Sequence, residues 1–116
     1  MGRQLAFWKY ENGIALDAGE VYQKSCVEGV SVSGLAQLPV NEILAKAKKV
    51  FREYERLDDY NYGGLEGNFT IYANPQSVVF DCSLRMNETE LNKIIDLMKG
   101  FGCPLYDPQI AVRFDG

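Results

Sequence analysis

The side chains most often used for catalysis and metal binding are either missing from this sequence or wrongly spaced. The 116 residues include no histidine, the side chain that most often transfers protons near pH 7 and most often ligates metals. The three cysteines are far apart, so no CxxC metal pair exists. No glycine cluster is followed by the Lys-Ser or Lys-Thr of a phosphate-binding loop. These absences argue against histidine-dependent hydrolases, zinc sites and P-loop nucleotide binding.

The remaining candidates for acid–base or nucleophilic chemistry are isolated carboxylates and one thiol. Asp58 and Asp59 are adjacent and Asp81 lies in a predicted strand, but their spacing matches neither an EF-hand loop nor a pair of glycosidase carboxylates. Cys103 follows a predicted helix C-terminus, where the helix dipole disfavours the thiolate that a nucleophile needs. We therefore predict no catalytic residue, no metal and no cofactor, and interpret the chain as a non-enzymatic protein.

A loop rich in tyrosine, glycine and acidic residues is the best candidate for a binding surface. It runs from residue 58 to residue 67, and the predicted partner contacts within it are Asp58, Asp59, Tyr60, Tyr62 and Glu66. Tyrosine offers a large contact area with few rotatable bonds, and glycine lets a loop adapt to a partner. The alternative is a solvated connector whose tyrosines fold back onto the sheet, and both interpretations are open.

Charge is distributed unevenly along the chain and disfavours nucleic acid as a direct partner. The net charge is −4; residues 1–57 carry 8 basic and 7 acidic side chains, whereas residues 58–116 carry 4 basic and 9 acidic ones. Phosphate contacts need clustered Lys and Arg, and the one basic cluster, near residue 48, is interrupted by acids. A protein partner with a basic surface suits the acidic half better. A second acidic set, Glu88, Glu90 and Asp96, is the alternative contact surface.

Hydrophobic periodicity predicts two strong helices and several strands. The first strong helix begins at Pro39 and is expected to reach about residue 57; the second spans 87–100, with Asn87 as its N-cap. A shorter helix follows the capping residue Asp17. The expected strands are 4–10, 14–16, 68–74, 78–82 and 109–114, with 68–74 and 78–82 forming a hairpin.

These elements predict a single α+β domain over residues 1–116. Because the middle strands form a hairpin, we expect one antiparallel-rich sheet of about four strands, with the two main helices packed on one face. The sequence contains no long apolar run that could span a membrane and no recognisable export signal. We therefore expect a cytoplasmic protein whose cysteines are reduced.

Three segments of the chain resemble parts of small acidic bacterial proteins that act as immunity proteins of contact-dependent or polymorphic toxin systems. These segments are the opening Leu5-Ala6-Phe7-Trp8-Lys9-Tyr10, the strand Val78-Val79-Phe80-Asp81-Cys82 and the tail Phe101-Gly102-Cys103-Pro104-Leu105-Tyr106-Asp107-Pro108-Gln109. The resemblance implies a protein that binds a toxin domain stoichiometrically, and nuclease toxins are basic where they meet phosphate. It carries no binding residues over to this chain. Two other classes stay open: a small homodimeric interaction or ligand-binding module, and a carboxylate-dependent enzyme.

Overall fold

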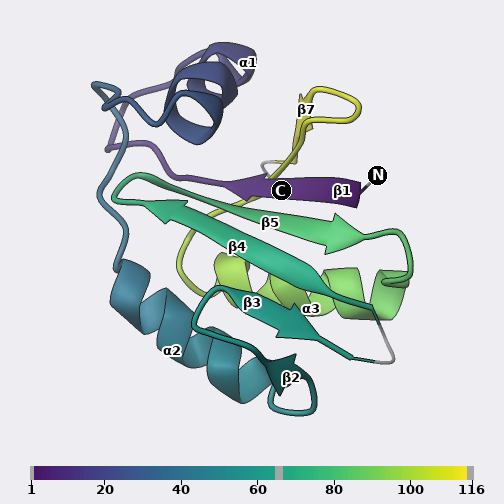
Figure 1. Cartoon of the computed structure of the whole chain (residues 1–116). Helices are drawn as coiled ribbons and strands as arrows, with labels where there is room; N and C mark the ends of the chain where they lie inside the picture. Colours follow the sequence, from purple (N-terminus) through teal and green to yellow (C-terminus); the bar gives the residue numbers. More distant parts are fainter. Residues whose placement is uncertain (1, 65–66, 115–116) are drawn as a thin grey trace.

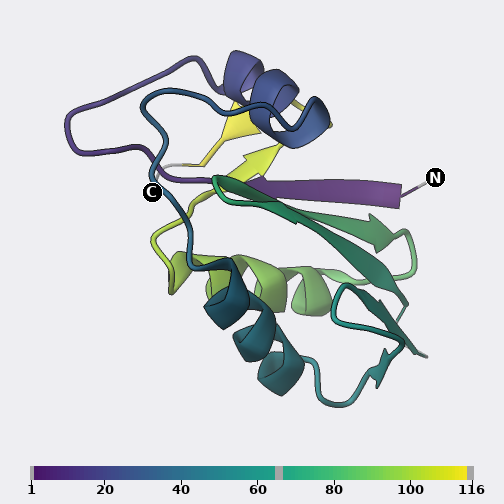
Figure 2. The ribbon, with the colours of Figure 1, turned by 60° about the vertical axis from the view of Figure 1, so that its left-hand side comes forward.

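The computed structural model describes residues 2–64 and 67–114. Within them, one antiparallel sheet has the strand order β2-β3-β4-β5-β1-β6-β7, with helices on both faces (Figures 1 and 2). The helical segments are α1 (Ala18–Val21), η1 (Tyr22–Val27, a π-helical continuation of α1), α2 (Val40–Val50) and α3 (Glu88–Lys99). The strands are β1 (Gly2–Phe7), β2 (Glu55–Arg56), β3 (Asn61–Gly63), β4 (Phe69–Asn74), β5 (Ser77–Ser83), β6 (Leu105–Asp107) and β7 (Val112–Arg113).

The β4–β5 hairpin and β1 form the centre of the sheet. Ile71 of β4 lies opposite Phe80 of β5, which in turn lies opposite Leu5 of β1. Because side chains alternate along a strand, these three residues share one face of the sheet with Phe7 and Phe69. The N-terminal strand therefore fills the middle of the sheet, and the last two strands add to its far side.

Helices α2 and α3 cover this face and close the larger core. Their apolar stripes include Ile43 and Ala47 of α2 and Ile94 and Met98 of α3, all fully buried. Helix α3 begins at Asn87, whose side-chain Oδ1 accepts a hydrogen bond from the Glu90 backbone N–H at 3.0 Å, as the sequence predicted. Figure 2 shows both helices on the same side of the sheet.

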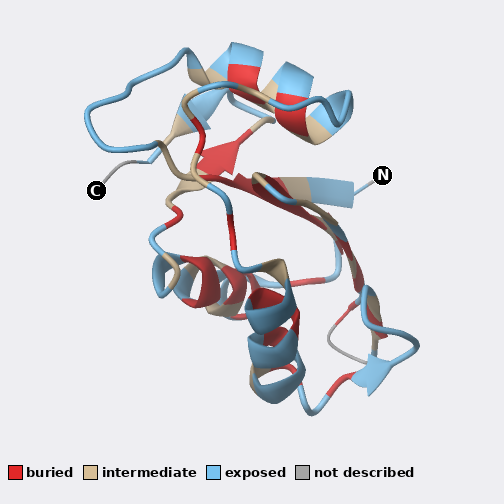
Figure 3. Cartoon of the chain, turned by 90° about the vertical axis from the view of Figure 1, so that its left-hand side faces the viewer, coloured by how far each residue is buried: buried red, intermediate tan, exposed pale blue. Residues whose placement is uncertain are grey.

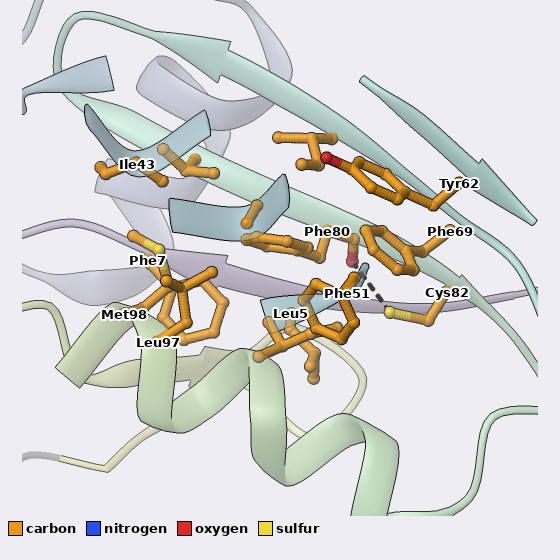
Figure 4. Packing of buried hydrophobic residues seen from close by; sticks show 14 of the residues in the cluster. Leu5, Phe7, Ile43, Phe51, Tyr62, Phe69, Phe80, Cys82, Leu97 and Met98 are labelled. Atoms are coloured by element: carbon orange, nitrogen blue, oxygen red, sulfur yellow. Dashed lines mark hydrogen bonds between the residues drawn. The ribbon is translucent and has the colours of Figure 1, made fainter. Parts of the chain in front are cut away.

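Aromatic rings fill the part of the core nearest the C-terminal end of α2. The ring of Phe51 lies 4.8 Å from that of Phe69, and Phe69 is stacked on Tyr62 at 4.9 Å with an angle of 10° between the rings (Figure 4). Tyr54 closes the cluster from the side, 5.6 Å from Phe69. These residues tie the end of α2, β3 and β4 together.

The short helical segments α1 and η1 pack on the opposite face, over a second core. Val21 packs with Ala6, Trp8, Val79 and Tyr106. The guanidinium of Arg113 in β7 lies over the rings of Tyr10, at 4.4 Å, and Trp8, at 5.2 Å, and donates a hydrogen bond to the Trp8 carbonyl at 2.8 Å. This contact fixes the last strand against the first.

The expectation of about four strands is wrong, because the described residues contain seven. The three strands that the sequence analysis missed are β2, β3 and β6, which have two or three residues each. Such short segments show no alternation of their own; β3 is a strand because it pairs with β4, and β6 because it pairs with β1. Tertiary pairing therefore decides them.

Two further expectations are also wrong. The helix expected over 39–57 ends at Val50, because the next residue leaves the helical region and Phe51 and Tyr54 both turn into the core. The strand expected over 14–16 does not form, and Ile14 is 42% exposed in a loop. The two main helices, α2 and α3, do pack on one face as expected, and the short segments α1 and η1 cover the opposite face.

We predict that Phe69→Ala lowers the free energy of unfolding by about 3–5 kcal/mol, because it leaves a cavity among four rings. Urea unfolding followed by circular dichroism measures this change. The control is Tyr72→Ala in the same strand, whose side chain is 56% exposed; we expect a change within about 0.5 kcal/mol there. If both substitutions lowered the free energy of unfolding equally, the assignment of Phe69 to the buried face of β4 and of Tyr72 to the exposed face would be wrong.

Candidate functional site

The acidic, tyrosine-rich segment forms the tip of a hairpin at one edge of the sheet. We call residues 55–63 the β2–β3 hairpin; Arg56 pairs with Tyr62 and Glu55 with Gly63. The hairpin projects from the body beside the C-terminal end of α2, and β2 is exposed along its length (Figures 1 and 3). Residues 61–63 of the segment are therefore a strand of the sheet, and the residues between β2 and β3 form the turn of the hairpin.

Asp58 forms hydrogen bonds across the turn of the hairpin. Its Oδ1 accepts hydrogen bonds from the backbone N–H groups of Tyr60, at 2.8 Å, and Asn61, at 2.9 Å, and the Asn61 side-chain amide donates to both carboxylate oxygens. These bonds to the ionised form, the one from the Tyr60 backbone first, lower the pKa of Asp58. Asp58 thus organises the hairpin tip as an Asx turn.

Asp59 joins the hairpin to α2. Its carboxylate lies 2.7 Å from the Arg56 guanidinium and 3.6 Å from the Lys48 ammonium. All three side chains are about half exposed, so the network contributes little stability by itself. Its main consequence is that it places the hairpin tip next to α2.

The two tyrosines of the segment have opposite environments. Tyr60 is 45% exposed, whereas Tyr62 is 2% exposed and stacks on Phe69 in the core. Burial also raises the pKa of the Tyr62 hydroxyl. Tyr62 is therefore a structural residue, as in the connector interpretation, while Tyr60 and the neighbouring Leu57, 68% exposed, form an apolar tip. Glu66 lies outside the described residues.

A cleft of about 300 Å³ opens next to the hairpin. It is enclosed by the end of α2, the segment after β3 and the first turns of α3, and we call it the Glu90 cleft; its lining residues are Glu53, Tyr54, Gly64, Asn87, Thr89, Glu90 and Lys93. Within it, the Tyr54 hydroxyl donates a 2.6 Å hydrogen bond to Glu90 Oε1, and the Lys93 ammonium lies 3.0 Å from Oε2. Only 8% of the Glu90 side chain is exposed.

The electrostatics of the cleft keep Glu90 negatively charged. The hydrogen bond from Tyr54 lowers the pKa of Glu90, and Lys93 lowers it further, against the opposing effect of burial. A general acid or base working near pH 7 would need its pKa raised toward that value. The carboxylate is therefore suited to holding a cation rather than to transferring protons.

The thiols and the other carboxylates do not assemble a reactive centre among the described residues. Burial raises the pKa of Cys26 and Cys103 to about 11 and of Cys82 to about 12, so all three stay protonated. In residues 2–64 and 67–114 no group of three or more acidic or cysteine side chains could hold a metal ion. Asp81 lies in β5, opposite Thr70, away from Asp58 and Asp59.

Sequence reasoning missed most of the Glu90 cleft. It identified Glu90 as the partner of the Asn87 cap and as an alternative contact, but the approach of Tyr54 and Glu53 to α3 depends on the turn after α2. The only sequence signal was the i,i+3 spacing of Glu90 and Lys93, which brings two helical side chains together.

Comparison of the chain with protein-family models and with curated protein sequences found no significant match. Among the described residues, no helix has both the length and the apolar character needed to cross a membrane.

We predict that acid opens the hairpin tip through Asp58. Since its folded pKa lies below the unfolded value near 4, its stabilising effect is present above about pH 4 and is lost as pH falls through the folded pKa. NMR shifts of the Tyr60 and Asn61 amides should follow this titration. Asp58→Asn keeps an acceptor oxygen without the charge and should abolish the pH dependence; an unchanged titration in that variant would contradict the assignment.

Proposed function

We propose that this chain is a non-enzymatic, cytoplasmic immunity protein that neutralises a basic toxin domain, a nuclease, by stoichiometric binding. The observation that carries the proposal is the β2–β3 hairpin, which presents Tyr60 and Leu57 at the edge of the sheet in a fixed conformation. The weak resemblance of three segments to such immunity proteins supports the same function.

Preorganisation is what makes this hairpin suitable for tight binding. A loop that must become ordered on binding loses conformational entropy, whereas a loop already fixed by Asp58 and Asp59 does not. The contact residues therefore divide by role: Tyr60 offers a contact surface, together with Leu57, while Asp58 orders the turn and supplies negative charge. Asp59 is paired with Arg56 and Lys48 and links the turn to α2. Buried Tyr62 supports the hairpin from below.

The acidic charge supports a basic partner. Glu53, Glu55 and Asp58 are exposed on or beside the hairpin, and the chain as a whole carries −4. Opposite charge accelerates association and is screened within about 8 Å at physiological ionic strength. Occupation of a phosphate-binding surface by these carboxylates would exclude a nucleic-acid substrate from a nuclease.

A homodimeric module is the second candidate, favoured by a different surface. Ile110, Val112 and Phe114, at and beside the edge strand β7, are each more than 40% exposed, and apolar edges often pair with another chain. Light scattering over a range of concentrations separates the candidates: a dimer that Phe114→Ser dissociates supports this module, and a monomer supports the toxin binder.

We predict that Tyr60→Ala increases the dissociation rate of the partner about 30-fold, equivalent to ~2 kcal/mol for a buried aromatic anchor. The partner to test is the C-terminal domain of any large secreted protein that the neighbouring gene encodes, and surface plasmon resonance at 50 and 300 mM NaCl measures both rates. The matched control is Tyr72→Ala, an equally exposed tyrosine on another surface. Association should be slower at the higher salt concentration.

The proposal fails if the neighbouring domain does not bind the wild-type chain or if the bound toxin remains active. If Tyr60→Ala and Tyr72→Ala dissociate at the same rate, the hairpin is not the contact surface.

A further inference from the structure

The Glu90 cleft differs from the exposed ion pairs of Asp59 because the carboxylate that holds its cation is nearly buried. The Lys93 ammonium lies against both carboxylate oxygens of Glu90, at 3.2 Å from Oε1 and 3.0 Å from Oε2. The Tyr54 hydroxyl also donates a hydrogen bond to Oε1 of this carboxylate. The cleft therefore combines a half-open volume with an oriented, nearly buried negative charge that is already paired with an ammonium group.

The charged side chains that line the cleft carry a net charge of −1 while Lys93 is in place. Glu53 and Glu90 contribute two negative charges, and Lys93 supplies one positive charge. Lys93 is 40% exposed at its side chain, so its flexible chain can move into water at small cost. Glu53 is exposed at the rim, next to β2 of the hairpin.

We propose that the Glu90 cleft receives an arginine side chain of the basic partner, which replaces Lys93 as the counter-ion of Glu90. This inference rests on the proposed function, and it names the chemistry that the partner must present beside the hairpin. A guanidinium fits a carboxylate with two parallel N–H donors, whereas an ammonium acts as a point charge. In the free protein, Lys93 occupies the place that the arginine takes.

Gly64 provides a steric test of the cleft that leaves its charges unchanged. A Cβ atom built on Gly64 would meet nothing closer than Tyr54 Cα and Cδ2, both at 4.0 Å, and the backbone there does not require glycine. Because Gly64 lines the cleft, we expect a leucine at this position to reduce the space in it.

The test is an NMR titration of the full chain with N-acetyl-arginine methylamide, with the uncharged citrulline analogue as the control ligand. We expect the arginine probe to shift the amide signals of Glu53, Gly64, Thr89 and Glu90, and the citrulline probe to leave them unchanged. Gly64→Leu should abolish binding of the arginine probe. Glu53→Gln should weaken it about threefold, as expected for a half-exposed ion pair, and Glu55→Gln, outside the cleft, should not.

Lys93→Met distinguishes a binding role for the cleft from a purely structural one. Removing the internal counter-ion should tighten binding of the arginine probe about threefold and should slow dissociation of the toxin domain by a similar factor. A thermal melt of each variant identifies any that fail to fold.

Equal binding of the citrulline probe, or unchanged binding by Gly64→Leu, would overturn the arginine site. If the probe binds as expected but neither Gly64→Leu nor Lys93→Met alters dissociation of the toxin domain, the partner does not use the cleft, and the inference is wrong although the proposed function stands. Loss of toxin binding in Tyr60→Ala decides the proposed function separately, because Tyr60 does not line the cleft.

Discussion

The packing of Phe69 against Phe51 and Tyr62 is the contact on which the functional end of the molecule depends. These rings come from β4, the residue that ends α2 and β3, and their centroids lie within 5 Å of Phe69. The strands β2 and β3 have only two and three residues, and an isolated hairpin of that size is not stable in water. The hairpin therefore exists because the core holds Tyr62, and its exposed tip takes its position from a buried ring.

The same aromatic cluster positions the Glu90 cleft. Tyr54 packs edge-on against Phe51 and Phe69, at 5.4 and 5.6 Å, and its hydroxyl reaches Glu90 at 2.6 Å. An amphipathic side chain can bury its ring and direct its polar end to a partner in this way. Core packing thus fixes both the position of the hairpin and the orientation of the Glu90 carboxylate on α3. The same aromatic cluster therefore positions the hairpin and the cleft relative to each other.

The charged side chains of this region form local hydrogen bonds and ion pairs in addition to contributing to the net charge. Asp58 and Asp59 satisfy backbone donors and neighbouring cations, and Glu90 is matched by Tyr54 and Lys93. The pKa values of Asp58 and Glu90 are lowered, so their ionised forms are stabilised. The ion-paired carboxylates and the exposed Tyr60 are the features on which the proposed recognition of a cationic protein surface rests.

The sequence by itself determined the elements that have strong local signals. The Asp17 and Asn87 caps, helix α3 and the β4–β5 hairpin follow from capping residues, a periodic stripe and a turn, all of which act between near neighbours. Tertiary structure decided the rest: that β2, β3 and β6 are strands, that α2 ends at Val50, that Tyr62 is buried while Tyr60 is exposed, and that Tyr54 reaches Glu90. These outcomes depend on pairing and packing between residues far apart in the chain, which no local pattern encodes.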